Sequence, residues 1–253
     1  MMILEDLKHE MSLRNSSRIS GISLSGYYYK PKDRHIQRLD PSIKDRIKDI
    51  ASERPTYGYR RVWAVLRNSG TEVNQKTVRN VLKDSDLNLP ASKHRGRTKK
   101  RNLFKPTGPD QLWETDITYI PTESGMTNLM CIKDCFTKEW QGYHYSRSCM
   151  ANDAMKLLEI KLEYIQKHTP EDNGDIESFH NSIKTDYIWP NEFWDFHYAS
   201  LEIGKAFIDY NERRPHSSID YLPPREFRRK FLDDPAFRER FAKKEVEVTL
   251  DEN

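Results

Sequence analysis

Two acidic motifs contain the residues of this chain whose types and spacing could do chemistry. Asp116 lies in LWETDITYI (112–120), and Glu177 lies with Lys184 in DIESFHNSIKTDYIW (175–189). Carboxylates can hold magnesium, and a nearby lysine can grip the scissile strand of a nucleic acid, so this set suits phosphoryl transfer. Two magnesium ions bridged by the carboxylates would activate the attacking oxygen and stabilise the leaving one.

Spacing and surroundings leave other interpretations of these residues open. Glu177 and Lys184 are seven residues apart, close to two helical turns, so their side chains would share one helix face. Taken alone, such a pair is more often a solvated surface. Asp116 falls within an apolar segment, where a carboxylate is costly to bury unless it binds a metal or a cation. The alternative is a strand-edge or turn residue. Glu177 and His180 also form an E-x-x-H pair, but the chain has no second copy of it.

Apolar periodicity predicts three short helices upstream of these motifs. SIKDRIKDIASERP has isoleucines at spacings of four and three and ends at Pro55. YRRVWAVLRNSG places Val62 and Leu66 on one face before Gly70, and NQKTVRNVLKDSDL begins at Asn74, a favoured N-cap. Three short helices with a tight, glycine-containing connection are typical of a helix-turn-helix unit. An ordinary three-helix bundle with a polar exterior would show the same pattern.

The third helix would be the one that reads DNA. Its outer face carries Lys76, Arg79 and Asn80, residue types that reach base edges and phosphates. The segment ASKHRGRTKKRNLFK (91–105) follows directly and contains seven Lys or Arg and no acid. Such a run is most often a flexible solvated linker, and it can also clamp a DNA backbone. Its candidate phosphate contacts are Lys93, Arg95, Arg97, Lys99, Lys100 and Arg101.

The sequence pattern changes after Pro109. LWETDITYI, MTNLMCIKDCF and EWQGYHYS are rich in aromatic, β-branched and other apolar residues and predict a meander of antiparallel strands. Residues 151–168 and 176–189 have apolar positions at spacings of three and four, which predict helices. From residue 191 on, helical segments alternate with turns marked by proline.

Charge is unevenly distributed along the chain. Residues 1–110 contain 24 Lys and Arg against 12 Asp and Glu, whereas residues 111–253 contain 18 against 27. A basic first half favours a polyanionic partner, because cations on phosphates release counterions. An unevenly charged but solvated surface is the alternative. No segment approaches the ~18 apolar residues of a membrane span, and three cysteines without CxxC spacing argue against a disulfide framework. We therefore expect a cytoplasmic protein that does not bind membranes.

Together the motifs resemble a known family. LWETDITYI, KDCFTKEWQGYHYS, DNGDIESFHNSIKTDYIW and YNERRPHSSIDYLPP are similar, in this order, to the integrase-core (DDE, retroviral integrase-like) transposases of bacterial and archaeal insertion sequences, of the orfB type. ERPTYGYRRVWAVLR resembles the helix-turn-helix that precedes their catalytic core. The resemblance implies an α/β (α+β) fold class, with a ribonuclease-H-like integrase core, here incomplete, preceded by an all-α helix-turn-helix domain.

The resemblance also implies a division of the chain. The expected parts are an N-terminal extension (1–40), a helix-turn-helix DNA-binding domain (41–90), a basic linker (91–109), a catalytic core (110–190) truncated internally near 160/161, and a C-terminal helical tail (191–253). The expected partners are DNA at the element ends and at the target, further copies of the chain, and a protein encoded in the element's upstream frame. Such a protein would associate with the nucleoid.

Residue roles follow from the same resemblance. Asp116 would be the first metal ligand, Glu177 the last, and Lys184 a cation that contacts DNA, with magnesium or manganese as the metal. A downstream signature, for which we expect a structural role, would comprise Asn211, Arg214, Pro215 and His216.

The second Asp of the family's carboxylate triad has no counterpart in this chain. In the family it lies in a DNG motif about 35 residues before the Glu, a position that here falls at Gly142 inside a predicted strand. Asp116 and Glu177 are 61 residues apart, where the family would need roughly 95. The simplest account is an in-frame deletion of about 35 residues at or near Ile160–Lys161.

Such a deletion would also remove the strand beside the one that carries Asp116. That strand would become a sheet edge unless KLEYI (161–165) replaced its neighbour, and KLEYI could equally continue the preceding helix. Because metal geometry tolerates only small errors, we expect catalysis to be defective. The acids that could stand in are Asp134, Asp153 and Asp172, and we expect none of them to do so. A DNA-binding protein without chemistry and a decayed transposase remnant that folds poorly are the alternatives.

Overall fold

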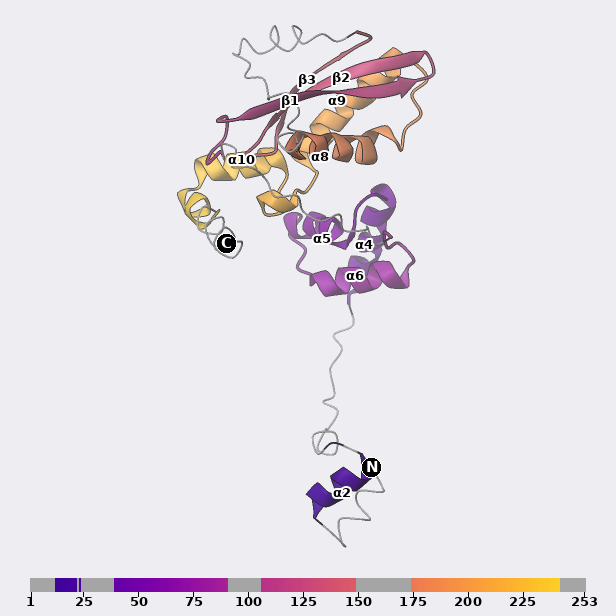
Figure 1. Ribbon diagram of the computed structural model, residues 1–253, viewed down its shortest axis with the longest axis vertical. Helices are drawn as coiled ribbons and strands as arrows, with labels where there is room; N and C mark the ends of the chain where they lie inside the picture. Colours follow the sequence, from indigo (N-terminus) through magenta and orange to yellow (C-terminus); the bar gives the residue numbers. More distant parts are fainter. Residues whose placement is uncertain (1–11, 22, 24–38, 91–105, 149–173, 242–253) are drawn as a thin grey trace. The chain divides into compact units, whose positions relative to one another are not determined.

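The computed structural model describes residues 12–21, 23, 39–90, 106–148 and 174–241 (Figure 1). Its contacts divide the chain into two units, Met1–Asp40 and Pro41–Asn253. The first unit contains a short helix, α2 (Leu13–Ser20), which ends at Gly21 in the left-handed conformation. No helix in the described part of the chain is long and apolar enough to cross a membrane.

Three helices begin the second unit: α4 (Pro41–Glu53), α5 (Tyr59–Asn68) and α6 (Gln75–Asp84). They bury apolar side chains at the predicted spacing, including Ile47, Val62 and Leu66. Asn74 caps α6, because its side-chain oxygen accepts a hydrogen bond from the backbone amide of Lys76 at 2.8 Å. The three helices predicted from the sequence are therefore confirmed.

The core of the second unit is built on an antiparallel meander, as the sequence predicts. Its strands are β1 (Trp113–Thr122), β2 (Gly125–Asp134) and β3 (Trp140–Ser146), in the order β1-β2-β3. Asp116 pairs with Cys131 in the register of β1 and β2. Among the described residues β1 pairs only with β2, so it is an edge strand of the described sheet. The segment KLEYI (161–165), which could replace its lost neighbour, lies outside the described residues, as does the helix predicted over residues 151–168.

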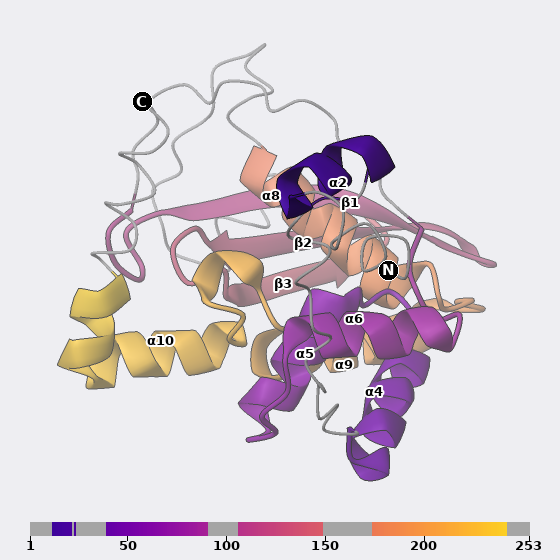
Figure 2. The same cartoon turned by 90° about the horizontal axis from the view of Figure 1, so that it is seen from below.

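Two helices cover one face of this sheet (Figures 1 and 2). They are α8 (Gly174–Ile183), which continues into a π-helical turn, η2 (Lys184–Ile188), and α9 (Phe196–Glu212). Ile120 and Trp140 of the strands share a buried cluster with Phe179 of α8 and Tyr210 of α9. Residues expected as a C-terminal tail thus contribute a helix to the core. Because strand side chains alternate, Asp116 lies on the same face as the buried Ile120, toward α8.

A second apolar cluster lies beside the turn between β2 and β3. Phe136 of this turn packs against Phe227 and Phe231 of α10 (Pro224–Asp233), with ring centroids 5.8 and 4.8 Å apart. A short 3-10 turn, η3 (Ser217–Ile219), connects α9 to this cluster through Ile219. The chain beyond α9 therefore folds back onto the end of the sheet.

Candidate functional site

Asp116 is positioned by β1 with its carboxylate against α8. Its Oδ2 lies 3.3 Å from Nδ1 of His180, a side chain that is almost completely buried, whereas the Asp116 side chain is 43% exposed. The Nε2 of His180 is buried and has no hydrogen-bond partner in the described part of the chain. His180 thus meets Asp116 with one ring nitrogen and holds the other inside the core. The sequence hint for this contact was the E-x-x-H spacing, which pointed to a metal pair rather than to Asp116.

Glu177 and His180 of α8 and Lys184 of η2 form a stripe along one face of the continuous helix. Residues three and four apart lie on the same helix face, so Glu177 and Lys184 lie one turn on either side of His180. Glu177 is exposed and Lys184 is half-buried. The structure therefore brings the predicted Lys184 and the unpredicted His180 to Asp116. Glu177 lies on the same face but forms no side-chain hydrogen bond or ion pair within the described residues.

Opposing effects set the pKa of Asp116. Partial burial, the largest single effect, raises the pKa of this carboxyl. Hydrogen bonds from His180 and from the backbone amide of Ile117, together with the positive charges of His180 and Lys184, lower it. The lowering effects prevail, so the pKa of Asp116 lies below its ordinary value of 3.8. Asp116 is therefore held in the carboxylate form that can bind a cation.

A buried ion pair beside Asp116 was not predicted from the sequence. Lys133 of β2 is 2% exposed, and its Nζ lies 3.4 Å from Oε2 of Glu114, two residues before Asp116. Burial lowers the pKa of Lys133, while Glu114 opposes that effect. The available signal was a lysine at an inward position of an apolar strand, in register with a glutamate.

The turn after β2 anchors the beginning of α8. Lys138 Nζ donates to Oδ2 of Asp175 at 2.8 Å and to the backbone carbonyl of Cys135 at 2.7 Å. Asp175 lies in the first turn of α8, two residues before Glu177. This ion pair therefore fixes the helix that carries Glu177 against the sheet that carries Asp116.

The predicted reading helix has the expected division between buried and exposed residues. Val78 is buried, whereas Lys76, Arg79 and Asn80 are exposed on α6. The Arg79 guanidinium lies 5.7 Å from the ring centroid of Tyr59 at the start of α5, which steadies it over the protein surface. The candidate linker contacts Lys93, Arg95, Arg97, Lys99, Lys100 and Arg101 lie outside the described residues.

Comparisons with known proteins match both parts of the second unit. Residues 38–95 match the model of an HTH-like domain, and residues 158–224 match that of an integrase core domain. An uncharacterized 31.7 kDa protein of insertion element IS407 from Burkholderia multivorans is 26% identical over 87% of this chain and 91% of its own length. The transposase of insertion element IS904 from Lactococcus lactis is 25% identical over 78% of this chain and 97% of its own length. The putative transposase InsK of insertion element IS150 from Escherichia coli is 23% identical over 90% of this chain and 97% of its own length.

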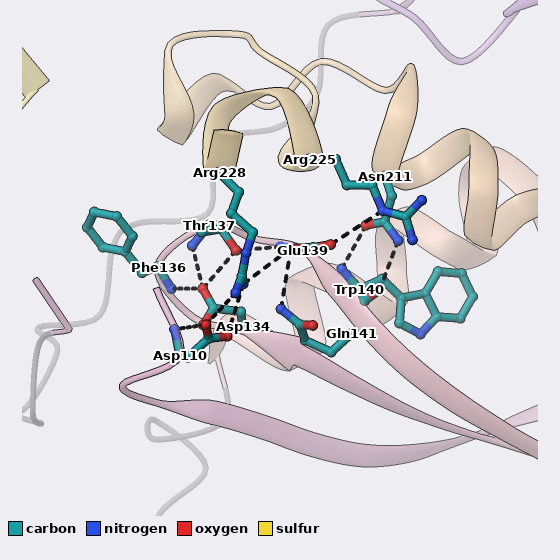
Figure 3. Close-up of polar contacts among 10 residues, drawn as sticks. All are labelled: Asp110, Asp134, Phe136, Thr137, Glu139, Trp140, Gln141, Asn211, Arg225 and Arg228. Carbon is teal, nitrogen blue, oxygen red and sulfur yellow. Dashed lines mark hydrogen bonds and ion pairs between the residues drawn. The ribbon is translucent and has the colours of Figure 1, made fainter. Parts of the chain in front are cut away.

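The chain therefore combines an HTH-like domain with an integrase core domain, and its relatives include transposases of insertion sequences. Within the core of this chain, residues of the downstream signature hold the elements together. The buried Asn211 accepts a hydrogen bond from the backbone amide of Trp140 at 2.9 Å and donates one to its carbonyl at 2.8 Å, which fastens α9 to β3 (Figure 3). Arg214, also buried, lies 2.7 Å from Asp186 and 2.9 Å from His216. Pro215, between Arg214 and His216 in the sequence, is buried as well.

The described residues of the chain do not assemble a two-metal centre. Among them, no group of three or more His, Cys, Asp or Glu side chains could hold a metal. Asp134 is not a substitute ligand, because it is fully buried and its carboxylate accepts hydrogen bonds from the backbone amides of Asp110, Phe136 and Thr137 and from the Thr137 hydroxyl (Figure 3). The other two stand-ins, Asp153 and Asp172, lie outside the described residues.

Proposed function

We propose that this chain is an insertion-sequence transposase that binds DNA but is defective in metal-dependent phosphodiester cleavage and strand transfer. The observation that carries the proposal is the contrast between two sites. The reading helix α6 presents Lys76, Arg79 and Asn80 to solvent. In the described part of the core, Asp116 has His180 and Lys184 beside it and no second carboxylate at the place where a triad would hold metal.

DNA binding is supported by chemistry as well as by family. Exposed cationic and amide side chains on a capped helix are suited to phosphates and base edges. The basic run that follows α6 would add contacts to the DNA backbone. We include in the proposal the element ends and the target as DNA partners, self-association on DNA, a partner protein from the upstream frame, and association with the nucleoid.

The defect is supported by the lengths of the alignments with relatives. The alignment with the IS407 protein runs over 261 residues, although it covers 87% of a 253-residue chain, or about 220 residues. With InsK it runs over 275 residues and covers 90%, or about 228. In each case some forty or more aligned positions have no residue in this chain, which is the scale expected for the proposed deletion.

A cleavage assay tests the defect. The unmodified chain should not cut or join a duplex carrying insertion-sequence ends in the presence of Mg²⁺ or Mn²⁺. A chimera that receives the missing segment from an intact relative should regain cleavage, and Asp116→Asn in that chimera should abolish it again. Robust cleavage by the unmodified chain that depends on Asp116 would refute the defect.

A salt titration tests DNA binding. Arg79→Ala should weaken binding and reduce the dependence of log Kd on log salt by about one unit, because one phosphate-neutralising charge is lost. Lys44→Ala is the matched control, because Lys44 is an exposed cation of α4 on a different surface. Equal effects of the two variants would assign binding to general charge and not to α6.

A DNA-binding protein without any chemistry is the second candidate, favoured by the incomplete ligand set. It would compete with an intact transposase for the element ends. In a cell that carries the intact enzyme, Asp116→Ala should then leave inhibition of transposition unchanged, while Arg79→Ala should relieve it. Inhibition that requires Asp116 would favour a chain that retains an active-site role.

A further inference from the structure

Arginines of the helix-turn-helix domain bind the integrase core through two aspartates. Arg54, at the end of α4, donates to both carboxylate oxygens of Asp209 in α9, with 2.8 Å between Nη1 and Oδ2. The same Oδ2 accepts a hydrogen bond from the hydroxyl of Tyr187 at 2.9 Å. A bidentate arginine–carboxylate pair is directional as well as charged, so it fixes orientation. Asp209 thus ties α4 to Tyr187, a residue of the π-helical turn η2.

The second contact reaches the same turn directly. Asp186 of η2 lies 2.7 Å from Arg214 of the core and 3.5 Å from Arg61 of α5. The side chains of Asp186 and Arg214 are 4% and 2% exposed, and that of Arg61 is 32% exposed. Asp186 is therefore held between one arginine of each domain.

A third set of contacts extends the interface beyond α9. Asn68 Nδ2 donates to the backbone carbonyl of Tyr221 at 3.0 Å, and the guanidinium of Arg67 donates to that of Asp220. The edge of the Trp63 ring meets the Tyr221 ring, with centroids 5.9 Å apart. The interface therefore uses α4 and α5. It leaves the exposed outer face of α6 available.

These contacts give a second explanation for the uneven distribution of charge along the sequence. Part of the positive charge of the first half is used within the chain, by Arg54 and Arg61, to bind acids of the second half. These two arginines are consequently poor candidates for DNA contacts, unlike Arg79.

We propose that this arginine interface is a positioning device, in which the docked helix-turn-helix domain sets the position of Lys184 beside Asp116. Asp186 and Tyr187 are both held by the interface, and they lie two and three residues after Lys184 in the same π-helical turn. Such turns are uncommon and frequently occur at functional sites. The proposal deepens the proposed function, because it would place DNA read by α6 in a fixed relation to the core.

Hydrogen–deuterium exchange on the full chain tests this proposal without DNA or cleavage. The double variant Arg54→Gln, Arg61→Gln removes both contacts from the helix-turn-helix side and leaves the buried Arg214–Asp186 pair in place. Backbone amides of residues 184–189 should exchange about ten-fold faster than in the wild type. The control is Arg60→Gln, which removes one positive charge from an exposed position of α5 and should leave these amides unchanged.

Exchange elsewhere in the same experiment separates docking from folding. Amides of β2 and of α5 should keep their wild-type protection in the double variant. Unchanged exchange at 184–189 with those amides protected would overturn the proposal. If the amides of α5 also exchange faster, the milder variant Arg54→Lys tests the proposal instead, because it keeps the positive charge but loses the bidentate geometry. It should still speed exchange at 184–189, and wild-type exchange there would overturn the proposal.

Adding a mixed-sequence DNA duplex tests the coupling itself. In the wild type, DNA bound at α6 should slow exchange at 184–189, and in the double variant it should protect α6 alone. Protection of both segments in the double variant would show that the interface is not needed for coupling. A chain that does not bind DNA at all would refute the proposed function, yet the DNA-free comparison would still decide whether the interface positions η2.

Discussion

Asp116 and Asp134 are both aspartates of the same antiparallel sheet, and their surroundings differ in the way that separates a reactive carboxylate from a structural one. Asp134 is completely buried at the end of β2 and accepts three hydrogen bonds from the turn that follows and one from the backbone amide of Asp110. Asp116 on β1 is 43% exposed, pairs with His180 at 3.3 Å and is close enough to Lys184 to be affected by its charge. Because a buried carboxylate must be satisfied where it lies, Asp134 has no capacity for a cation, whereas Asp116 remains accessible.

This difference bears on whether the chain could compensate for the metal ligand that we propose it lacks. An acid near the site can bind a metal only if its carboxylate oxygens are not already used by hydrogen bonds within the fold. Asp134 is committed to the turn that also receives Arg228, which pairs with Asp110 and with Glu139 at 3.4 Å (Figure 3). Moving Asp134 toward a metal would therefore dismantle the end of the sheet.

The largest expected effect is from Asp134→Ala. Removing a buried carboxylate leaves three backbone amides and one hydroxyl without their acceptor, so the free energy of unfolding should fall by about 3–5 kcal/mol. Asp116→Ala should lower it by less than about 1 kcal/mol, because that side chain is partly exposed. Urea unfolding of both variants measures the difference. Similar losses of unfolding free energy in the two variants would show that the two aspartates do not differ in their structural role.

Asn211→Ala should have the next largest effect. Its side-chain amide pairs with both the backbone amide and the carbonyl of Trp140, and both residues are fully buried. Two lost hydrogen bonds in a buried site should cost about 2–3 kcal/mol of unfolding free energy. Glu212→Ala, at the neighbouring exposed position, is the control and should change stability by less than about 1 kcal/mol, because its ion pair with Arg225 lies at the surface. A loss for Asn211→Ala no greater than that of the control would show that β3 does not depend on this contact.

The elements around both aspartates could be predicted from the sequence because they depend on local patterns. Apolar spacing gave α4, α5, α6 and α8, and the cap at Asn74 lies where the residue type predicted it. Asp134, the last residue of β2, lies in the segment MTNLMCIKDCF that the sequence predicts as a strand. These features depend on neighbours within one or two turns of chain.

The contacts between elements could not be predicted in the same way. His180 meets Asp116 only because α8 packs on the sheet through Phe179, whose ring lies 5.5 Å from that of Trp140. Arg54 and its partner Asp209 are 155 residues apart. Helical and strand periodicities specify which face is buried, but they do not specify which polar residues meet across two packed faces.

The smallest expected effect is the pH dependence that Asp116 contributes. Its pKa in the folded chain lies below the ordinary value of 3.8, so the ionised form stabilises the fold. This contribution is present above the ordinary pKa and is lost as the pH falls through the lower, folded value. Because the side chain is 43% exposed, solvent screening should limit it to less than about 1 kcal/mol.

Unfolding of the wild type and of Asp116→Asn between about pH 6 and about pH 3 measures this contribution. The wild type should be the more stable at the higher pH, and its advantage should shrink on acidification. An advantage that instead grows as the pH falls would mean that burial, and not His180 and Lys184, controls the pKa of this carboxyl. His180→Gln sharpens the test, because it removes a hydrogen bond and a charge that both lower the pKa of Asp116. In that variant the carboxyl should titrate at higher pH by NMR, which would show that Asp116 owes its ionised state to α8.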